Sequence, residues 1–84
     1  MTNYSPQDIA GDCRRAACLV THHGRDNLEG INAILQEAVE TDRVTPLIIA
    51  VLDLYQFLIP ELRTEFGMKI MSDAVVRLAT RESE

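Results

Sequence analysis

Three side chains of this 84-residue sequence could bind one metal ion together: Cys18, His22 and His23. Cys18 and His22 are four residues apart, so on a helix they would share one face at a spacing that suits two ligands of one ion. A structural zinc ion needs four ligands, and His23 with Asp26 would complete the set only if the following loop folded back. A metal- or redox-responsive regulator using Cys18, His22 and His23 is therefore the alternative function, and we expect no cofactor.

Catalytic chemistry has little support in the sequence. Cys18 with His22 as its base could form a nucleophile, but no group that orients the histidine and no oxyanion site is recognisable. Asp53 lies among apolar residues, and burial raises the pKa of a carboxyl group, as in many acid–base catalysts. However, no second carboxylate lies at a usable helical spacing from it. The sequence also lacks a glycine-rich phosphate loop and the CxxC, HExxH and GxSxG motifs, so we expect a protein that is not an enzyme.

Helix signals recur along the chain and strand signals almost never, so these side chains should be positioned by helices. Ser5, Pro6 and Asp8 predict a helix start, and Gly24 could end that helix in the left-handed conformation. In this first helix we expect Ile9, Cys13, Ala16, Ala17 and Val20 to face inward, and Arg14, Arg15 and Cys18 to point away. In the last helix we expect Ile70, Met71, Ala74, Val75 and Leu78 to be buried. The predicted helices cover about residues 6–23, 27–42, 46–58, 61–65 and 66–80.

The predicted third helix, between Pro46 and Pro60, is apolar around almost its whole circumference. A helix of this kind is buried on all sides, so we expect a single domain over residues 1–84: a small antiparallel bundle of four to five helices, with the third at its centre. Three short helices wrap a fourth poorly, and each large aliphatic side chain left in water forgoes roughly 1.5–3 kcal/mol. The spare face should therefore join a second copy or another protein, through an interface of Ile49, Leu52, Asp53, Tyr55 and Gln56.

Charge and composition narrow the class of partner and the compartment. Thirteen acidic against eight basic residues give a net charge of −5, which disfavours binding to nucleic acid or to an anionic membrane. The longest apolar stretch is too short for a membrane span, and the first residues do not have the pattern of a signal peptide. On one helix, the Cα atoms of Cys13 and Cys18 would be roughly 8–9 Å apart, too far for a disulfide. We therefore expect a cytoplasmic protein with reduced thiols.

Three segments carry a resemblance to known proteins: Gly30-Ile31-Asn32-Ala33-Ile34-Leu35-Gln36-Glu37-Ala38, Leu52-Asp53-Leu54-Tyr55 and Leu62-Arg63-Thr64. Over about residues 28–79 the chain resembles small uncharacterised all-helical proteins of actinobacteria and their phages. The resemblance implies a short accessory protein, of the kind that a phage makes to act on a host protein. It assigns no activity and no site. Together with the apolar third helix, it favours a non-enzymatic interaction module, most simply a homodimer.

Overall fold

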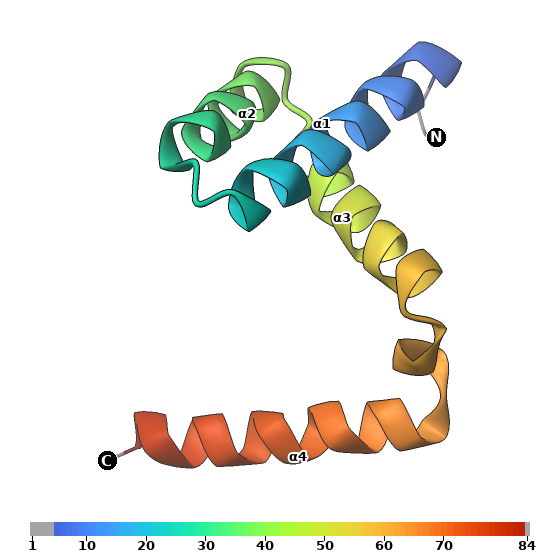
Figure 1. The fold of residues 1–84 in the computed structure, drawn as a ribbon, viewed down its shortest axis with the longest axis vertical. Coiled ribbons are helices and arrows are strands. Elements are labelled where there is room, and N and C mark those ends of the chain that lie inside the picture. The colour runs from blue at the N-terminus through green and yellow to red at the C-terminus, as the bar shows by residue number, and fades with distance from the viewer. Residues whose placement is uncertain (1–4, 84) are drawn as a thin grey trace. The chain divides into compact units, whose positions relative to one another are not determined.

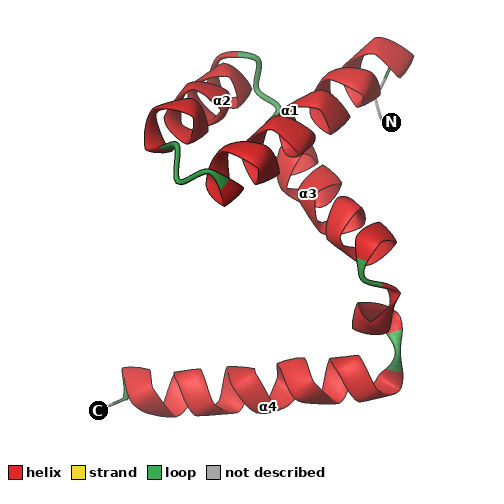
Figure 2. Cartoon of the chain, in the orientation of Figure 1, coloured by secondary structure: helices red, strands yellow, loops and turns green. Residues whose placement is uncertain are grey.

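The computed structural model describes residues 5–83, and this part of the chain is all-helical, as predicted (Figures 1 and 2). No strand occurs between residues 5 and 83. Within the same residues, no helix combines the length and the apolar character that crossing a membrane would require. In chain order the elements are α1 (Pro6–Gly24), α2 (Leu28–Glu40), α3 (Val44–Leu58), the 3-10 helix η1 (Pro60–Arg63) and α4 (Glu65–Glu82). No bound differs from the predicted one by more than two residues: α2 and η1 end two residues earlier, α3 begins two residues earlier and α4 ends two residues later.

Helix α1 begins at the predicted residue and α4 begins one residue before its predicted start, and at each start a side chain accepts an otherwise unpaired backbone N–H. The Ser5 hydroxyl oxygen accepts from the N–H of Asp8 at 3.1 Å, and the Asp8 carboxylate accepts from the N–H of Ser5 at 3.3 Å. This reciprocal capping box starts α1. The Thr64 hydroxyl accepts from the N–H of Gly67 at 3.1 Å and starts α4 in the same way.

The ends of α1 and α2 share a motif that the sequence did not predict. Asp26 and Asp42 each follow a helix in the left-handed conformation, with φ of 54° and 57°. After each aspartate, the next backbone N–H bonds to a carbonyl five residues earlier, at 2.9 and 2.8 Å, which defines a Schellman motif. The expected cap, Gly24, has no positive φ and remains inside α1. Because Asp26 ends one helix, the cap of α2 is Asn27, whose side chain accepts from Gly30 at 3.0 Å.

The described chain forms two compact units, Met1–Leu54 and Tyr55–Glu84, with the boundary inside α3. In the first unit, α1 packs against α2. Its buried core consists of Ala16, Ile34, Ala38 and Leu47, so all three helices contribute to it. Around this core pack four partly buried apolar side chains: Cys18, Leu19, Ala50 and Val51. The core is therefore small, and the inward side of α3 is the side that carries Leu47.

The inward face of α1 differs from the predicted one. Ile9 is 50% exposed and Cys13 is also exposed, although both were expected to face the core. The buried residues of α1 are Asp12, Arg15 and Ala16, so the prediction that Arg15 points away is wrong. Asp12 and Arg15 are one turn apart and form an ion pair, which makes their burial possible.

The second unit contains η1 and α4, which pack closely at one point. Gly67 is the buried residue of α4. A Cβ atom at this position would lie 2.1 Å from the backbone carbonyl oxygen of Glu61, which is far inside van der Waals contact. The Thr64 hydroxyl also donates to this carbonyl, at 2.7 Å. Glycine is therefore required where α4 passes the end of η1.

Candidate interaction surface

The outer face of α3, defined here as Ile48, Ile49, Leu52 and Asp53, is an exposed apolar surface of the first unit. Ile48, Ile49 and Leu52 are 54%, 52% and 55% exposed, whereas Leu47 is 1% exposed. Because residues four apart lie one turn apart on the same side, Leu52 continues Ile48 and Asp53 continues Ile49. Asp53 is also exposed. The outer face is thus a contiguous aliphatic patch with a carboxylate at its edge, opposite the side chain that anchors the helix.

The other two predicted interface residues, Tyr55 and Gln56, belong to the second unit. Tyr55 is 37% exposed and Gln56 is half-buried. All five predicted residues therefore lie on α3, three of them in the first unit and two in the second. The neighbouring Ile48, which was not included in the prediction, is as exposed as Ile49 and belongs to the same patch.

Helix α4 carries a second set of exposed apolar side chains within its own unit. The prediction that they form a buried face is wrong in this unit. The 3-10 helix η1 covers Gly67, but a unit this small has too few residues to enclose the face of an 18-residue helix. Of the predicted residues, Ala74 is half-buried and the others are 48–62% exposed: Ile70, Met71, Val75 and Leu78. Phe66, which was not in the prediction, is 74% exposed.

A network of charged side chains holds the elements of the first unit together. Asp12 is only 5% exposed, and its carboxylate accepts two hydrogen bonds from Arg43, the residue before α3. The Arg43 Nε donates to Oδ1 at 3.2 Å and its Nη2 donates to Oδ2 at 2.5 Å. This two-bond fork fixes the angle as well as the separation of the two groups. Arg15 donates a further hydrogen bond to Oδ1 of Asp12 at 3.1 Å.

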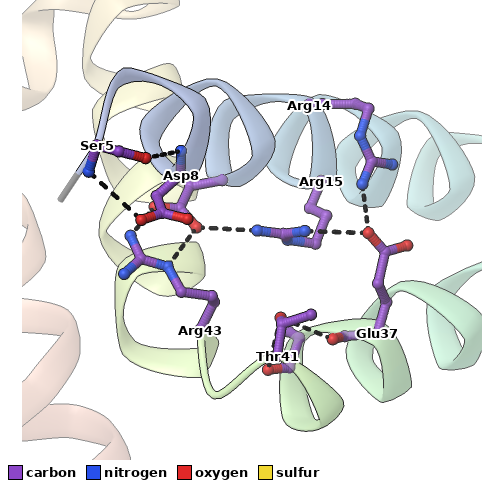
Figure 3. A network of polar contacts seen from close by, with 9 residues as sticks. Ser5, Asp8, Arg14, Arg15, Glu37, Thr41 and Arg43 are labelled. Atoms are coloured by element: carbon purple, nitrogen blue, oxygen red, sulfur yellow. Dashed lines mark hydrogen bonds and ion pairs between the residues drawn. The ribbon is translucent and has the colours of Figure 1, made fainter. Parts of the chain in front are cut away.

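Arg15 extends the network from α1 to α2, and Figure 3 shows its guanidinium directed toward Glu37. Its Nη1 donates to Oε1 of Glu37 at 3.0 Å, and Arg14 donates to the same oxygen. The Nε of Arg15 is buried and has no hydrogen-bond partner within the described part of the chain. Arg14 is half exposed, so the network runs from a buried centre at Asp12 to an open edge at Glu37.

These contacts shift the charge equilibria of the network. The hydrogen bond from Arg43 lowers the pKa of Asp12 below its ordinary 3.8; burial opposes this effect and Arg15 adds to it. The hydrogen bonds from Arg14 and then Arg15 lower the pKa of Glu37. Burial acts to lower the pKa of Arg15, but its hydrogen bonds to Glu37 and Asp12 outweigh this, and the pKa is raised. Asp12, Glu37 and Arg15 are therefore held in their charged forms at neutral pH.

The structure places Cys18, His22 and His23 near the end of α1 without assembling a site from them. Cys18 is half-buried and packs on the core, His22 is half-buried and His23 is exposed. Residues 5–83 contain no group of three or more His, Cys, Asp or Glu side chains placed to hold a metal ion. The described residues therefore give no support to a metal site at Cys18, His22 and His23.

The geometry around His22 also bears on the nucleophile hypothesis. The side-chain oxygen Oδ1 of Asn27 accepts the N–H of Gly30. The side-chain nitrogen Nδ2 of Asn27 is therefore the atom that faces Nδ1 of His22, at 3.4 Å. His22 therefore contacts the residue that caps α2, and within residues 5–83 no hydrogen bond joins it to Cys18.

The chain matches no protein-family model, and neither the curated proteins nor the solved structures contain a significant match to it.

The charged network was missed in the sequence because its members are far apart in the chain: Asp12 and Arg43 are separated by 31 residues. The one local signal was the spacing of Asp12 and Arg15, three residues apart, which suits an ion pair on a helix.

Proposed function

We propose that the chain is a non-enzymatic protein–protein interaction module that self-associates by burying the outer face of α3. The observation that carries this proposal is the exposure of Ile48, Ile49 and Leu52, each more than half exposed and adjacent to the others. Contiguous apolar patches are uncommon on monomeric proteins and commonly mark interaction sites. The driving force is the removal of these aliphatic side chains from water.

A second copy of the chain is the proposed occupant of this face. Twofold dimers are the most common oligomers, and in them the same patch meets itself. The aliphatic side chains of the two copies would pack against each other in such a dimer. Asp53, at the edge of the patch, would lie toward the rim of the interface, where water or a polar group can hydrogen-bond to its carboxylate. We also propose that Tyr55 and Gln56 extend the interface, and that the helices complete an antiparallel bundle around α3. If the outer face instead binds a host protein, the chain would act as the accessory protein that the resemblance implies.

Sedimentation equilibrium at tens of micromolar protein tests self-association. The informative variant is Leu52→Ser, because a residue that is 55% exposed can be made polar without opening the core. We expect it to weaken dimer formation about tenfold, since each dimer loses two leucines from its interface. Leu28→Ser is the matched control: the same change in α2, at a leucine that is 67% exposed and lies outside the outer face.

Circular dichroism should show the same helix content in both variants and in the unmodified chain. A chain that sediments as a monomer throughout this range would contradict self-association. Equal weakening by Leu28→Ser and Leu52→Ser would contradict the assignment of the interface to α3. In either case, the protein-partner version would remain for a separate binding experiment.

A further inference from the structure

We infer that Arg43 is a positioning residue, which fixes the orientation of α3, and with it the outer face of α3, against α1. Its contribution to association rests on the function proposed above. Its effect on the orientation of the helix does not depend on that function and can be measured separately.

The first step of the inference is that few groups hold α3 in the first unit. Leu47 is the buried residue of α3, with Ala50 and Val51 packed at the edge of the core. One deeply buried aliphatic side chain fixes where the helix lies. It constrains much less how the helix is tilted or rotated about its own axis, because apolar contacts have no preferred direction.

The second step is that Arg43 supplies the missing directional contact. Its backbone carbonyl accepts the N–H of Leu47 at 3.0 Å, so this residue directly precedes α3 and is joined to its first turn. Its guanidinium makes two hydrogen bonds to the two oxygens of Asp12 on α1, and the arginine fork is planar. A planar contact at one end, together with Leu47 one turn further on, defines the direction of the helix axis.

The third step is that the acceptor itself is held rigidly. Asp12 is buried and also accepts from Arg15, so its carboxylate has little freedom to follow a moving helix. Arg15 provides a natural comparison, because its other partner, Glu37, is on α2 (Figure 3). Loss of Arg15 should therefore weaken the contact between α1 and α2 without removing the contact between Asp12 and Arg43.

Distance distributions between two spin labels measure the orientation directly in the full chain. One label is attached to the exposed Cys13 of α1, the other to Asp53→Cys on α3, with Cys18 replaced by alanine. Labelled chains are diluted into excess unlabelled protein, so that only distances within one chain are recorded. The series compares Arg43, Arg43→Lys and Arg43→Gln, with Arg15→Gln as the control for general loss of stability.

We expect Arg43→Gln to widen the distance distribution about twofold, because the two-bond fork is lost. Arg43→Lys keeps the charge but makes a single-point contact, so its width should be intermediate. Arg15→Gln should widen it much less, because the two-bond fork from Arg43 to Asp12 remains, while lowering the midpoint of urea unfolding. An unchanged width in Arg43→Gln, or equal widening in Arg15→Gln, would overturn the positioning role.

Sedimentation of the same variants without the labels connects the orientation to association. Arg43→Gln should weaken dimer formation about tenfold, and Arg15→Gln should not. If the unmodified chain is a monomer, the proposed function fails, and the distance distributions still decide the role of Arg43. If Arg43→Gln widens the distribution but associates normally, its link to the outer face of α3 is overturned.

Discussion

Asp12 shows how a charged residue can occupy a core position in a very small protein. Its carboxylate gains hydrogen bonds from Arg43 and Arg15, which compensate for the loss of water. Removing one partner of a buried pair is costly, because it leaves the other charge without compensation. The centre of the first unit therefore depends on polar contacts as well as on its few buried aliphatic side chains.

Acid should destabilise the first unit through Asp12. Pairing with Arg43 lowers the pKa of Asp12 in the folded state below its ordinary 3.8. As the pH falls below about 4.5, the unfolded chain takes up a proton that the folded chain does not, so the stability present at higher pH is lost. Glu37, whose pKa is also lowered, acts in the same direction.

Urea unfolding followed by circular dichroism at a series of pH values measures this dependence. The unmodified chain should lose stability progressively from about pH 4.5 downward, through the folded-state pKa of Asp12. The variant Asp12→Asn should be less stable at neutral pH and show a shallower acid dependence. An equally steep loss of stability in Asp12→Asn would contradict the assignment to this residue.

The same residues show what could be predicted at this scale. The capping role of Ser5 was predicted correctly, because a cap depends only on neighbours within one helical turn. The burial of Arg15 was not predicted, because it depends on Glu37, which lies 22 residues away in the sequence. An isolated arginine in a sequence is normally exposed, and only the position of its partner reverses that expectation.

At the scale of the elements, α1 and α2 both end at an aspartate in a conformation that glycine adopts at lower cost. Asp42→Gly should therefore stabilise the first unit by about 0.5–1 kcal/mol, since it removes the strain of a side chain at φ of 57°. It also removes a negative charge near the negative end of α2. Urea unfolding at neutral pH measures the change in free energy.

The control for this substitution is Ala33→Gly, at an exposed position inside α2. There glycine should cost about 1 kcal/mol, because the backbone gains freedom in the unfolded state with no strain to relieve. The two replacements should therefore act with opposite signs. A loss of stability in Asp42→Gly would indicate that the carboxylate of Asp42 has a role beyond ending the helix.

The junction of η1 and α4 makes a second prediction at this scale. Gly67→Ala should destabilise this junction by about 1–3 kcal/mol, because the new Cβ would overlap the Glu61 carbonyl oxygen and the backbone must shift. Amide hydrogen exchange at residues 64–68 should become faster. Gly24→Ala is the control, because a Cβ there has open space and the residue is helical, and exchange in the second unit should not change.

The positions of the helices were predicted better than their inward faces. Helical periodicity and caps located every element to within a few residues, since these signals are local. The inward face of α1 was misassigned because apolar residues occur on more than one side of it, and the choice depends on the ion pairs. The left-handed caps were missed because aspartate tolerates this conformation less readily than glycine and gives a weaker signal.

At the scale of the whole molecule, composition and periodicity were enough to predict an all-α protein. They were not enough to predict how much of the apolar content is enclosed. Although 46% of the residues are hydrophobic, the buried core of the described chain consists of Ala16, Ile34, Ala38 and Leu47. Two of these are alanines, which add little buried area. The excess apolar surface of α3 was predicted from its sequence, and its outer face is the basis of the proposed association.

Within residues 5–83, Arg43 connects three helices from one position in the chain. Its N–H closes the end of α2 by bonding to Ala38, its carbonyl begins α3, and its guanidinium holds α1 through Asp12. The length of the turn between α2 and α3 is therefore fixed by these contacts. A residue inserted or deleted there would change where one helix stops, where the next starts and how a third is docked, all in a single step.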